Sequence, residues 1–223
     1  MNVNKRYKDR LHAGQQLALA FGQAQPARAA ALILALPRGG VPVGYALAKG
    51  LGLPLDVLLV RKLGLPGHEE FAMGAVGTDS VRIVNSEVVH AFHVAPDQVA
   101  SACVREWRRI AAREQLYRQG RPQPQLQGRP VILVDDGMAT GASMRAAIAV
   151  ARAKGAAHLT VAVPVAAPDT CAAIRREVDQ LVCPIVPPAF GAVGAWYRHF
   201  DQTEDTEVRH LLAQAWQEQT QHA

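Results

Sequence analysis

The hydrophobic and polar positions of the chain alternate between short apolar runs and longer stretches with helical spacing. Apolar runs predict buried strands at residues 31–36, 55–61, 131–134, 158–165 and 181–185. Apolar positions three and four residues apart predict helices at residues 41–49, 96–117, 143–154 and 168–178. Two further runs, 73–76 and 81–84, predict a small antiparallel pair around a GTDS turn.

This alternation of strands and helices predicts the fold class. Parallel strands joined by right-handed helical crossovers account for it. We therefore predict an α/β three-layer sandwich with a mainly parallel central sheet and a small hood. Leu17, Ala20, Phe21 and Ala24 have helical spacing and predict an N-terminal helix on the core. A length of 223 residues suits one domain, so residues 1–223 are interpreted as a single unit.

Composition narrows the class of protein. A hydrophobic fraction of 49% with 19% charged residues is typical of a globular chain. The apolar runs are too short to span a bilayer, and the polar N-terminus has no secretory signal. Cys103, Cys171 and Cys183 are odd in number and form no CxxC pair. This pattern favours a cytoplasmic location and argues against a disulfide framework or a zinc site. The net charge of +5 suits an anionic ligand.

Residues 131–144, VILVDDGMATGASM, carry the main candidate chemistry. The predicted strand ends where Asp135 and Asp136 begin, so both acids are expected at the carboxyl edge of the sheet, where such folds bind ligands. The small residues and hydroxyls that follow lead into a helix, whose N-terminus attracts anions. The predicted phosphate-binding residues are Ala139, Thr140, Gly141, Ala142 and Ser143.

The acids and the loop need different partners, because a carboxylate repels a phosphate. The vicinal hydroxyls of a ribose donate hydrogen bonds to acids, and its 5′-phosphate suits the loop, so ribose 5-phosphate explains both. No GxxxxGK[ST] or GxGxxG sequence supports a Walker or dinucleotide site. A plain strand end with an Asp-Asp turn and a capped helix is the alternative.

VILVDDGMATGAS is similar to the signature of type I phosphoribosyltransferases, which bind 5-phosphoribosyl 1-diphosphate. The resemblance implies that Asp135 and Asp136 hold the ribose 2′ and 3′ hydroxyls. It also implies transfer of ribose 5-phosphate to a nitrogenous acceptor with release of pyrophosphate. Mg²⁺ would be bound mainly through the diphosphate substrate, with no metal ligands supplied by the protein alone. Homodimers are common in the family, so a homodimer is expected.

Two further segments resemble parts of this family. Leu36-Pro37-Arg38-Gly39-Gly40 is similar to its pyrophosphate loop, which implies a cis peptide at Pro37–Arg38; a plain connection with a solvated arginine is the alternative. Arg61 and Lys62 resemble a basic pair before a mobile loop, here residues 63–70, that closes over the diphosphate. The expected pyrophosphate ligands are Arg38, Gly39, Gly40, Arg61 and Lys62. The expected catalytic residues are Asp135, Asp136, Arg38 and Lys62.

The acceptor is less well defined. Enzymes of the hypoxanthine-guanine type carry an acidic residue where this chain has Ala139, which argues against a 6-oxopurine. The hood is expected from residues 184–208, with an N-terminal contribution. Phe190, Trp196 and Tyr197 there are candidate acceptor-binding rings. Packing of the C-terminal segment on the domain explains the same rings.

Two other functions fit the same residues. A non-catalytic regulator could bind 5-phosphoribosyl 1-diphosphate or a nucleotide, and RNA or DNA through a stripe of arginines at positions 105, 108, 109, 113, 118 and 121. Such a run is more typical of the solvated face of an amphipathic helix, so nucleic acid is not the favoured partner. A hydrolase acting on a preformed nucleotide is the other alternative.

Overall fold

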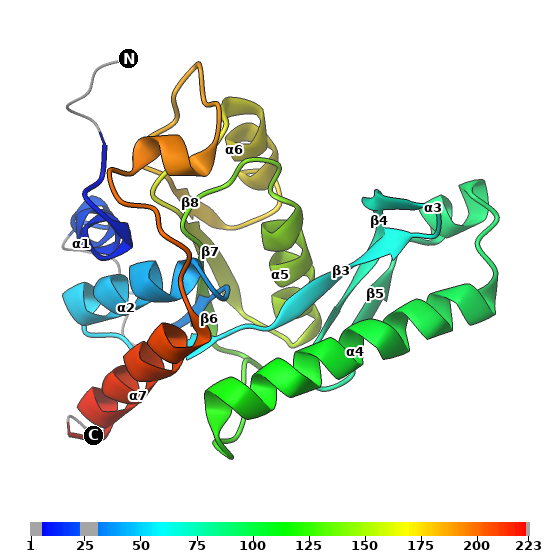
Figure 1. The fold of residues 1–223 in the computed structure, drawn as a ribbon, viewed down its shortest axis with the longest axis horizontal. Helices are drawn as coiled ribbons and strands as arrows, with labels where there is room; N and C mark the ends of the chain where they lie inside the picture. Colours follow the sequence, from blue (N-terminus) through cyan, green and yellow to red (C-terminus); the bar gives the residue numbers. More distant parts are fainter. Residues whose placement is uncertain (1–5, 23–30, 222–223) are drawn as a thin grey trace.

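The computed structural model describes residues 6–22 and 31–221, which form a central sheet with helices on both faces and a projecting arm (Figure 1). The elements of the central part are α1 (Arg10–Ala20), β1 (Leu32–Ala35), α2 (Gly40–Leu51), β2 (Leu55–Val57), β6 (Pro130–Val134), α5 (Ala142–Ala153), β7 (His158–Ala162), α6 (Pro168–Ile174), β8 (Gln180–Val182), the 3-10 helix η3 (Val193–Trp196) and α7 (Asp205–Gln221). The elements of the arm are β3 (Val60–Leu65), β4 (His68–Gly77), β5 (Arg82–Val84), α3 (Ser86–Ala91) and α4 (Pro96–Arg118).

The central sheet has the strand order β2-β1-β6-β7-β8, and every neighbouring pair is parallel. Alternate residues of each strand face opposite sides. Ile33 and Ile132 pack in the cluster that contains residues of α2 and α7, whereas Leu34 and Leu133 pack with those of α5 and α6. Helices therefore cover both faces, which confirms the predicted α/β fold with a mainly parallel central sheet.

The arm is an antiparallel sheet, β3-β4-β5, with α3 and α4 beside it, and Figure 1 shows it extending away from the central sheet. The predicted antiparallel pair is confirmed, with β4 beginning earlier, at His68. The single strand predicted for residues 55–61 is wrong. The chain leaves the central sheet after Val57, and Val60 begins β3; the buried residues Leu58 and Leu59 make the apolar run continuous across the break.

Residues 63–70 are also not the loop that the sequence predicts. β3 continues to Leu65 and β4 starts at His68, so the segment is a hairpin. Pro66 and Gly67 form its turn, where Gly67 has a φ of 78°, a value that glycine adopts readily. Leu63 and Leu65 are buried, and this burial holds the segment in the sheet.

The helices α1 and α7, the first and last of the described residues, both pack against α2. Leu17 and Phe21 of the N-terminal segment are buried as predicted, but Ala20 is exposed and Ala24 lies outside the described residues. The helix α7, which the sequence analysis does not predict, buries Trp216, whose Nε1 donates to Leu55 O at 3.1 Å. Within residues 6–22 and 31–221, none of the helices combines the length and apolar character needed to cross a membrane.

Candidate functional site

The two acids after β6 and the glycines before α2 lie against each other at the carboxyl edge of the sheet. A Cβ on Gly40 would lie 2.7 Å from Val134 O and 3.0 Å from the Cα of Asp135, and one on Gly39 would overlap Asp136 Oδ2. Only glycine allows this approach. The Pro37–Arg38 peptide bond is cis, as the family resemblance implies. The two motifs, about 100 residues apart in sequence, therefore form one site.

Arg10 of α1 completes the acid pair. Its Nε donates to Asp136 Oδ2 at 2.8 Å, and its Nη1 donates to Asp201 O at 2.6 Å. The guanidinium also lies 3.9 Å from the centre of the Phe200 ring, a cation–π contact. Burial raises the pKa of Asp135 well above its ordinary value, and the charge of Asp136 raises it further. Burial likewise raises the pKa of Asp136, while the hydrogen bond and charge of Arg10 oppose that rise.

The aromatic residues near the C-terminus form a buried cluster around Tyr7. Trp196 Nε1 donates to Phe190 O at 3.0 Å, and the Tyr197 hydroxyl donates to Asp136 O at 2.6 Å. Phe190, Trp196 and Tyr197 are each less than a tenth exposed. Packing explains these rings, and acceptor binding by them stays a prediction. Phe200, half-buried beside Tyr197, is the more open ring.

The loop between β6 and α5 presents small residues at the start of a helix. Thr140 and Ser143 are exposed, as are Ala139 and Ala142, whereas Gly141 is buried. Gly141 is the N-cap of α5 with a φ of 73°, and a Cβ there would lie 2.8 Å from Thr170 Cγ2. The glycine therefore lets the loop pack on α6, where the Thr170 hydroxyl donates to Ala139 O at 2.6 Å.

Two adjoining clefts extend from this loop toward the arm. The first, of about 480 Å³, is lined by Pro37, Arg61, Asp135 and Ser143, among others. The second, of about 630 Å³, is lined by Arg61, Lys62 and Ser143, among others. Lys62 is exposed on β3. Arg38 does not line either cleft; its guanidinium faces Glu204 at 3.7 Å. The structure thus brings the predicted basic residues Arg61 and Lys62 to the cleft that Ala142 and Ser143 also line.

Sequence reasoning missed three residues at the clefts and one beside the acids. Arg109 of α4 lines both clefts and Arg113 lines the first, while the buried Glu106 lines the second and contacts Arg61 and Arg109. A glutamate on the apolar face of an amphipathic helix was the available signal for Glu106. Arg10 carried no such signal, because 126 residues separate it from Asp136.

One arginine of the predicted stripe points inward. Arg118 is buried, and its Nη1 donates to Asp56 Oδ2 at 2.8 Å and its Nη2 to Val57 O at 3.1 Å. Arg105 and Arg109 donate to Glu106. Arg118 therefore does not belong to an exposed stripe, whereas the other five arginines are exposed, and nucleic acid binding through them stays an alternative.

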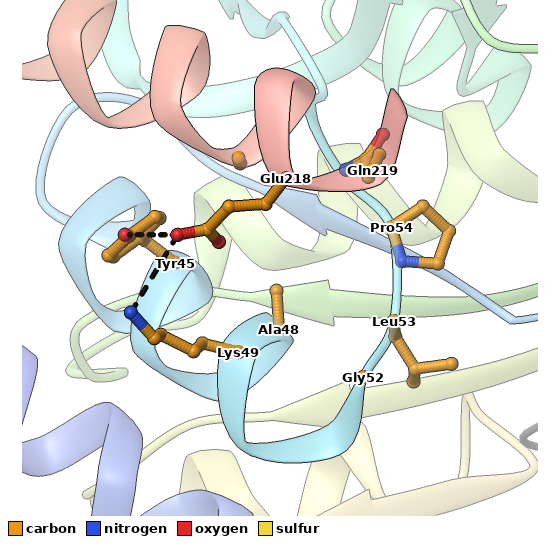
Figure 2. A pocket seen from close by; sticks show the side chains of 9 residues that line it. Tyr45, Ala48, Lys49, Gly52, Leu53, Pro54, Glu218 and Gln219 are labelled. Atoms are coloured by element: carbon orange, nitrogen blue, oxygen red, sulfur yellow. Dashed lines mark hydrogen bonds and ion pairs between the residues drawn. The ribbon is translucent and has the colours of Figure 1, made fainter. Parts of the chain in front are cut away.

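A separate pocket of about 590 Å³ lies between α2 and α7, next to the residues that lead into β2 (Figure 2). Figure 2 shows Glu218 pointing toward Tyr45 and Lys49; the Tyr45 hydroxyl donates to Glu218 at 3.3 Å. The start of a strand is the opposite edge of a parallel sheet from the acids. This pocket is therefore not part of the site.

Comparisons with known proteins agree on one family. Residues 15–195 match the model of the phosphoribosyl transferase domain. Two proteins, from Mycobacterium tuberculosis strains CDC 1551 / Oshkosh and H37Rv, are 46% identical over 214 residues; their names give phosphoribosyl transferase as a provisional assignment. The matches cover 95% of this chain and 47% of each relative, so the chain spans about half their length. The crystal structure of TT1426 from Thermus thermophilus is 39% identical with a TM-score of 0.84, covering 94% of this chain and 98% of that chain.

Proposed function

Because the chain belongs to the phosphoribosyl transferase domain family, we propose that it transfers ribose 5-phosphate from 5-phosphoribosyl 1-diphosphate to a nitrogenous acceptor. The observation that carries this proposal is the convergence of three groups at one sheet edge. Asp135 and Asp136 lie against Gly39 and Gly40, next to the loop of residues 139–143. The acids can accept hydrogen bonds from the hydroxyls of a ribose 5-phosphate, and the start of a helix can bind its phosphate. The two groups lie side by side, as the hydroxyls and the phosphate do in that molecule.

Each group has a role in the proposed reaction. The carboxylates of Asp135 and Asp136 accept hydrogen bonds from the ribose hydroxyls. Thr140, Ser143 and the first N–H groups of α5 donate to the 5′-phosphate. The C1–O bond breaks and its electron pair leaves with pyrophosphate, while a lone pair of the acceptor nitrogen forms the new bond to C1. The acceptor then loses its proton. Positioning and electrostatics account for catalysis of this kind.

The acid pair is chemically suited to the proposed Mg²⁺. This ion binds through one or two carboxylates together with phosphate oxygens of the substrate and keeps several waters. Within the part of the chain that the structure describes, no cluster of three or more His, Cys, Asp or Glu side chains could hold a metal. In the proposal, bound Mg²⁺ neutralises charge on the diphosphate, while Arg61 and Lys62 of β3 contribute positive charge from the protein.

The acceptor is proposed to be a nitrogenous compound other than a 6-oxopurine, since Ala139 supplies no acid to such a base. Arg10 donates a hydrogen bond to Oδ2 of Asp136 and lies over the Phe200 ring. A magnesium-dependent screen for pyrophosphate release across purines, pyrimidines and small amines identifies the acceptor. If no compound in this panel leads to pyrophosphate release while donor binding is intact, the result favours the non-catalytic regulator. Release of ribose 5-phosphate from nucleotides alone favours the hydrolase.

The donor-binding proposal is tested by Asp135→Asn combined with Asp136→Asn. We expect affinity for 5-phosphoribosyl 1-diphosphate with Mg²⁺ to fall at least about 30-fold in calorimetry, a loss of about 2 kcal/mol. The matched control is Asp97→Asn combined with Asp169→Asn, which removes the same charge from two exposed positions. Circular dichroism checks that the fold survives. Equal affinity in the site variant and the control refutes the assignment.

A further inference from the structure

One face of α4 forms a wall of the cleft that Asp135 also lines. Glu106, Arg109, Ile110, Arg113 and Tyr117 are three or four residues apart, so their side chains share this face. Ile110 and Tyr117 are buried, which turns the face toward the protein. Arg109 and Arg113, at its edge, line the cleft of about 480 Å³ whose other wall contains Asp135 and Ser143.

Glu106 gathers three guanidinium groups at this wall. Arg61 Nε donates to Glu106 Oε2 at 3.1 Å, while Arg105 Nε at 3.3 Å and Arg109 Nη1 at 2.9 Å donate to Oε1. Glu106 is 7% exposed. One buried carboxylate therefore orients three arginines, and the group as a whole keeps a surplus of positive charge.

Helix α4, which contains these arginines, is hydrogen-bonded to the central sheet. Arg118, at its C-terminal end, bonds both Asp56 Oδ2 and Val57 O of β2. Figure 1 shows α4 running from the arm toward α7, against which it packs. The wall is thus a fixed surface and not a mobile loop.

We propose that Arg109 and Arg113 of α4, with Arg61 of β3, bind the diphosphate of the ribose donor, and that Glu106 positions Arg61 and Arg109 for it. This inference rests on the proposed function, which places the ribose at Asp135 and the 5′-phosphate at Ser143. The diphosphate then extends into the same cleft. Two arginines four residues apart repel each other, and a polyanion between them removes that repulsion.

The α4 wall also stabilises the departing group. As the C1–O bond breaks, its electron pair moves onto pyrophosphate, so negative charge grows on this side of the cleft. Fixed guanidinium groups that face this charge lower the barrier without reorganising. Arginine suits the task because its planar fork binds two phosphate oxygens at once. A small polyanion is favoured over a nucleic acid backbone, because the two arginines face a cleft that also contains an acid.

The test uses Arg109→Ala combined with Arg113→Ala, with inorganic pyrophosphate and Mg²⁺ as the probe in calorimetry. We expect the affinity to fall at least about tenfold. The matched control is Arg108→Ala, on the same helix, because Arg108 lines a shallow surface groove with Ser101 and Val104. It should change the affinity less than about twofold. Unchanged affinity in the double variant overturns the proposal, as does wild-type protein with no measurable affinity for pyrophosphate.

Further measurements separate this proposal from the proposed function. Wild-type protein that binds pyrophosphate through these arginines but does not bind 5-phosphoribosyl 1-diphosphate refutes the transferase and retains the anion subsite. If donor binding is lost in the Asp135/Asp136 variant and intact in the arginine variant, only the subsite is refuted. Salt-dependent binding of an oligonucleotide that falls equally in Arg108→Ala and in the double variant overturns the subsite in favour of a nucleic acid surface.

Protein stability needs its own control, and thermal unfolding of each variant provides it. If the double variant does not fold, Arg109→Gln and Arg113→Gln are tested singly, since each keeps most of the side chain. Each is expected to weaken pyrophosphate binding about threefold or more. Two folded single variants with wild-type affinity overturn the proposal.

Discussion

Two charged regions face each other across the cleft, and they combine the same residue types in opposite proportions. On the sheet side, Asp135 and Asp136 meet one arginine, Arg10. On the arm side, the single acid Glu106 meets three arginines. The first region keeps a negative surplus, which suits hydroxyl donors and cations; the second keeps a positive surplus, which suits phosphates. The two halves of the proposed donor site thus contain the same residue types and differ in the ratio of acids to arginines.

The pKa shifts follow the same division. Burial raises the pKa of Asp135, and the charge of Asp136 adds to the rise. Burial would raise the pKa of Glu106 too, but the hydrogen bond from Arg61 and the charges of Arg109 and Arg61 hold it below its ordinary value. The acid on the sheet side is therefore costly to ionise without a ligand, and the acid on the arm side is ionised readily. Stability measurements without ligand can test this contrast.

The largest effect is expected from Arg10→Ala, which removes the only arginine that donates to the acid pair among the described residues. Asp136 is then a largely buried charge without a cation, since its side chain is 16% exposed. Breaking such a pair should lower the free energy of unfolding by about 2 to 3 kcal/mol, which urea unfolding at neutral pH measures. In the Asp136→Asn background the same substitution should cost less than half as much. Equal costs in the two backgrounds would show that Arg10 acts through Phe200 and Asp201 alone.

The part of the site that contains Asp135 and Asp136 could largely be predicted from the sequence. Short apolar runs that end at Gly, Pro or Asp mark the strands, and the ends of parallel strands meet at one edge, so residues 36–40 and 131–143 were predicted to share a site. The structure places them in contact through Gly39 and Gly40. The helix α7 was missed, although Val208, Leu211, Leu212 and Ala215 have helical spacing.

The arm side could be predicted only in part, for physical reasons: the antiparallel pair and the long helix were predicted, but the path into the arm and the partners of Glu106 were not. Residues 57–60, VLLV, are apolar throughout, so the step from the central sheet to the arm has no polar or glycine signal. LGLPGHEE contains glycines and a proline, which fit a loop as well as a hairpin turn; burial of Leu63 and Leu65 by tertiary packing decides between them. The partners of Glu106 include Arg61, which lies 45 residues away and reaches it only when β3 packs on α4. Long-range pairs of this kind carry no local pattern.

A smaller effect is expected from Glu106→Gln, which keeps the size of the side chain and removes its charge. Three guanidinium groups then lose their shared carboxylate, but all three are partly exposed and screened by solvent. The free energy of unfolding at neutral pH should therefore fall by about 1 kcal/mol, which lowers the melting temperature by a few degrees. Because the folded pKa of Glu106 is depressed, its contribution is present above the ordinary glutamate pKa and is lost as the pH falls through the folded pKa. The difference between variant and wild type should therefore disappear in acid, and a difference that persists there would indicate lost packing.

The smallest effect, and the opposite sign, is expected from Asp135→Asn. Since the folded pKa of Asp135 is raised, its contribution to stability is fully present below the ordinary aspartate pKa of about 3.9 and is lost as the pH rises through the folded value. The asparagine variant avoids that loss, so without ligand it should be more stable than wild type at neutral pH by about 0.5 to 1 kcal/mol. Thermal scans across the pH range should show the gain shrinking toward acid. Asp97→Asn, at an exposed position, controls for the change in net charge. A variant that is less stable than wild type at neutral pH would mean that the Asp135 carboxylate supports the fold, and the charge contrast across the cleft would then not reflect a site built for a ligand.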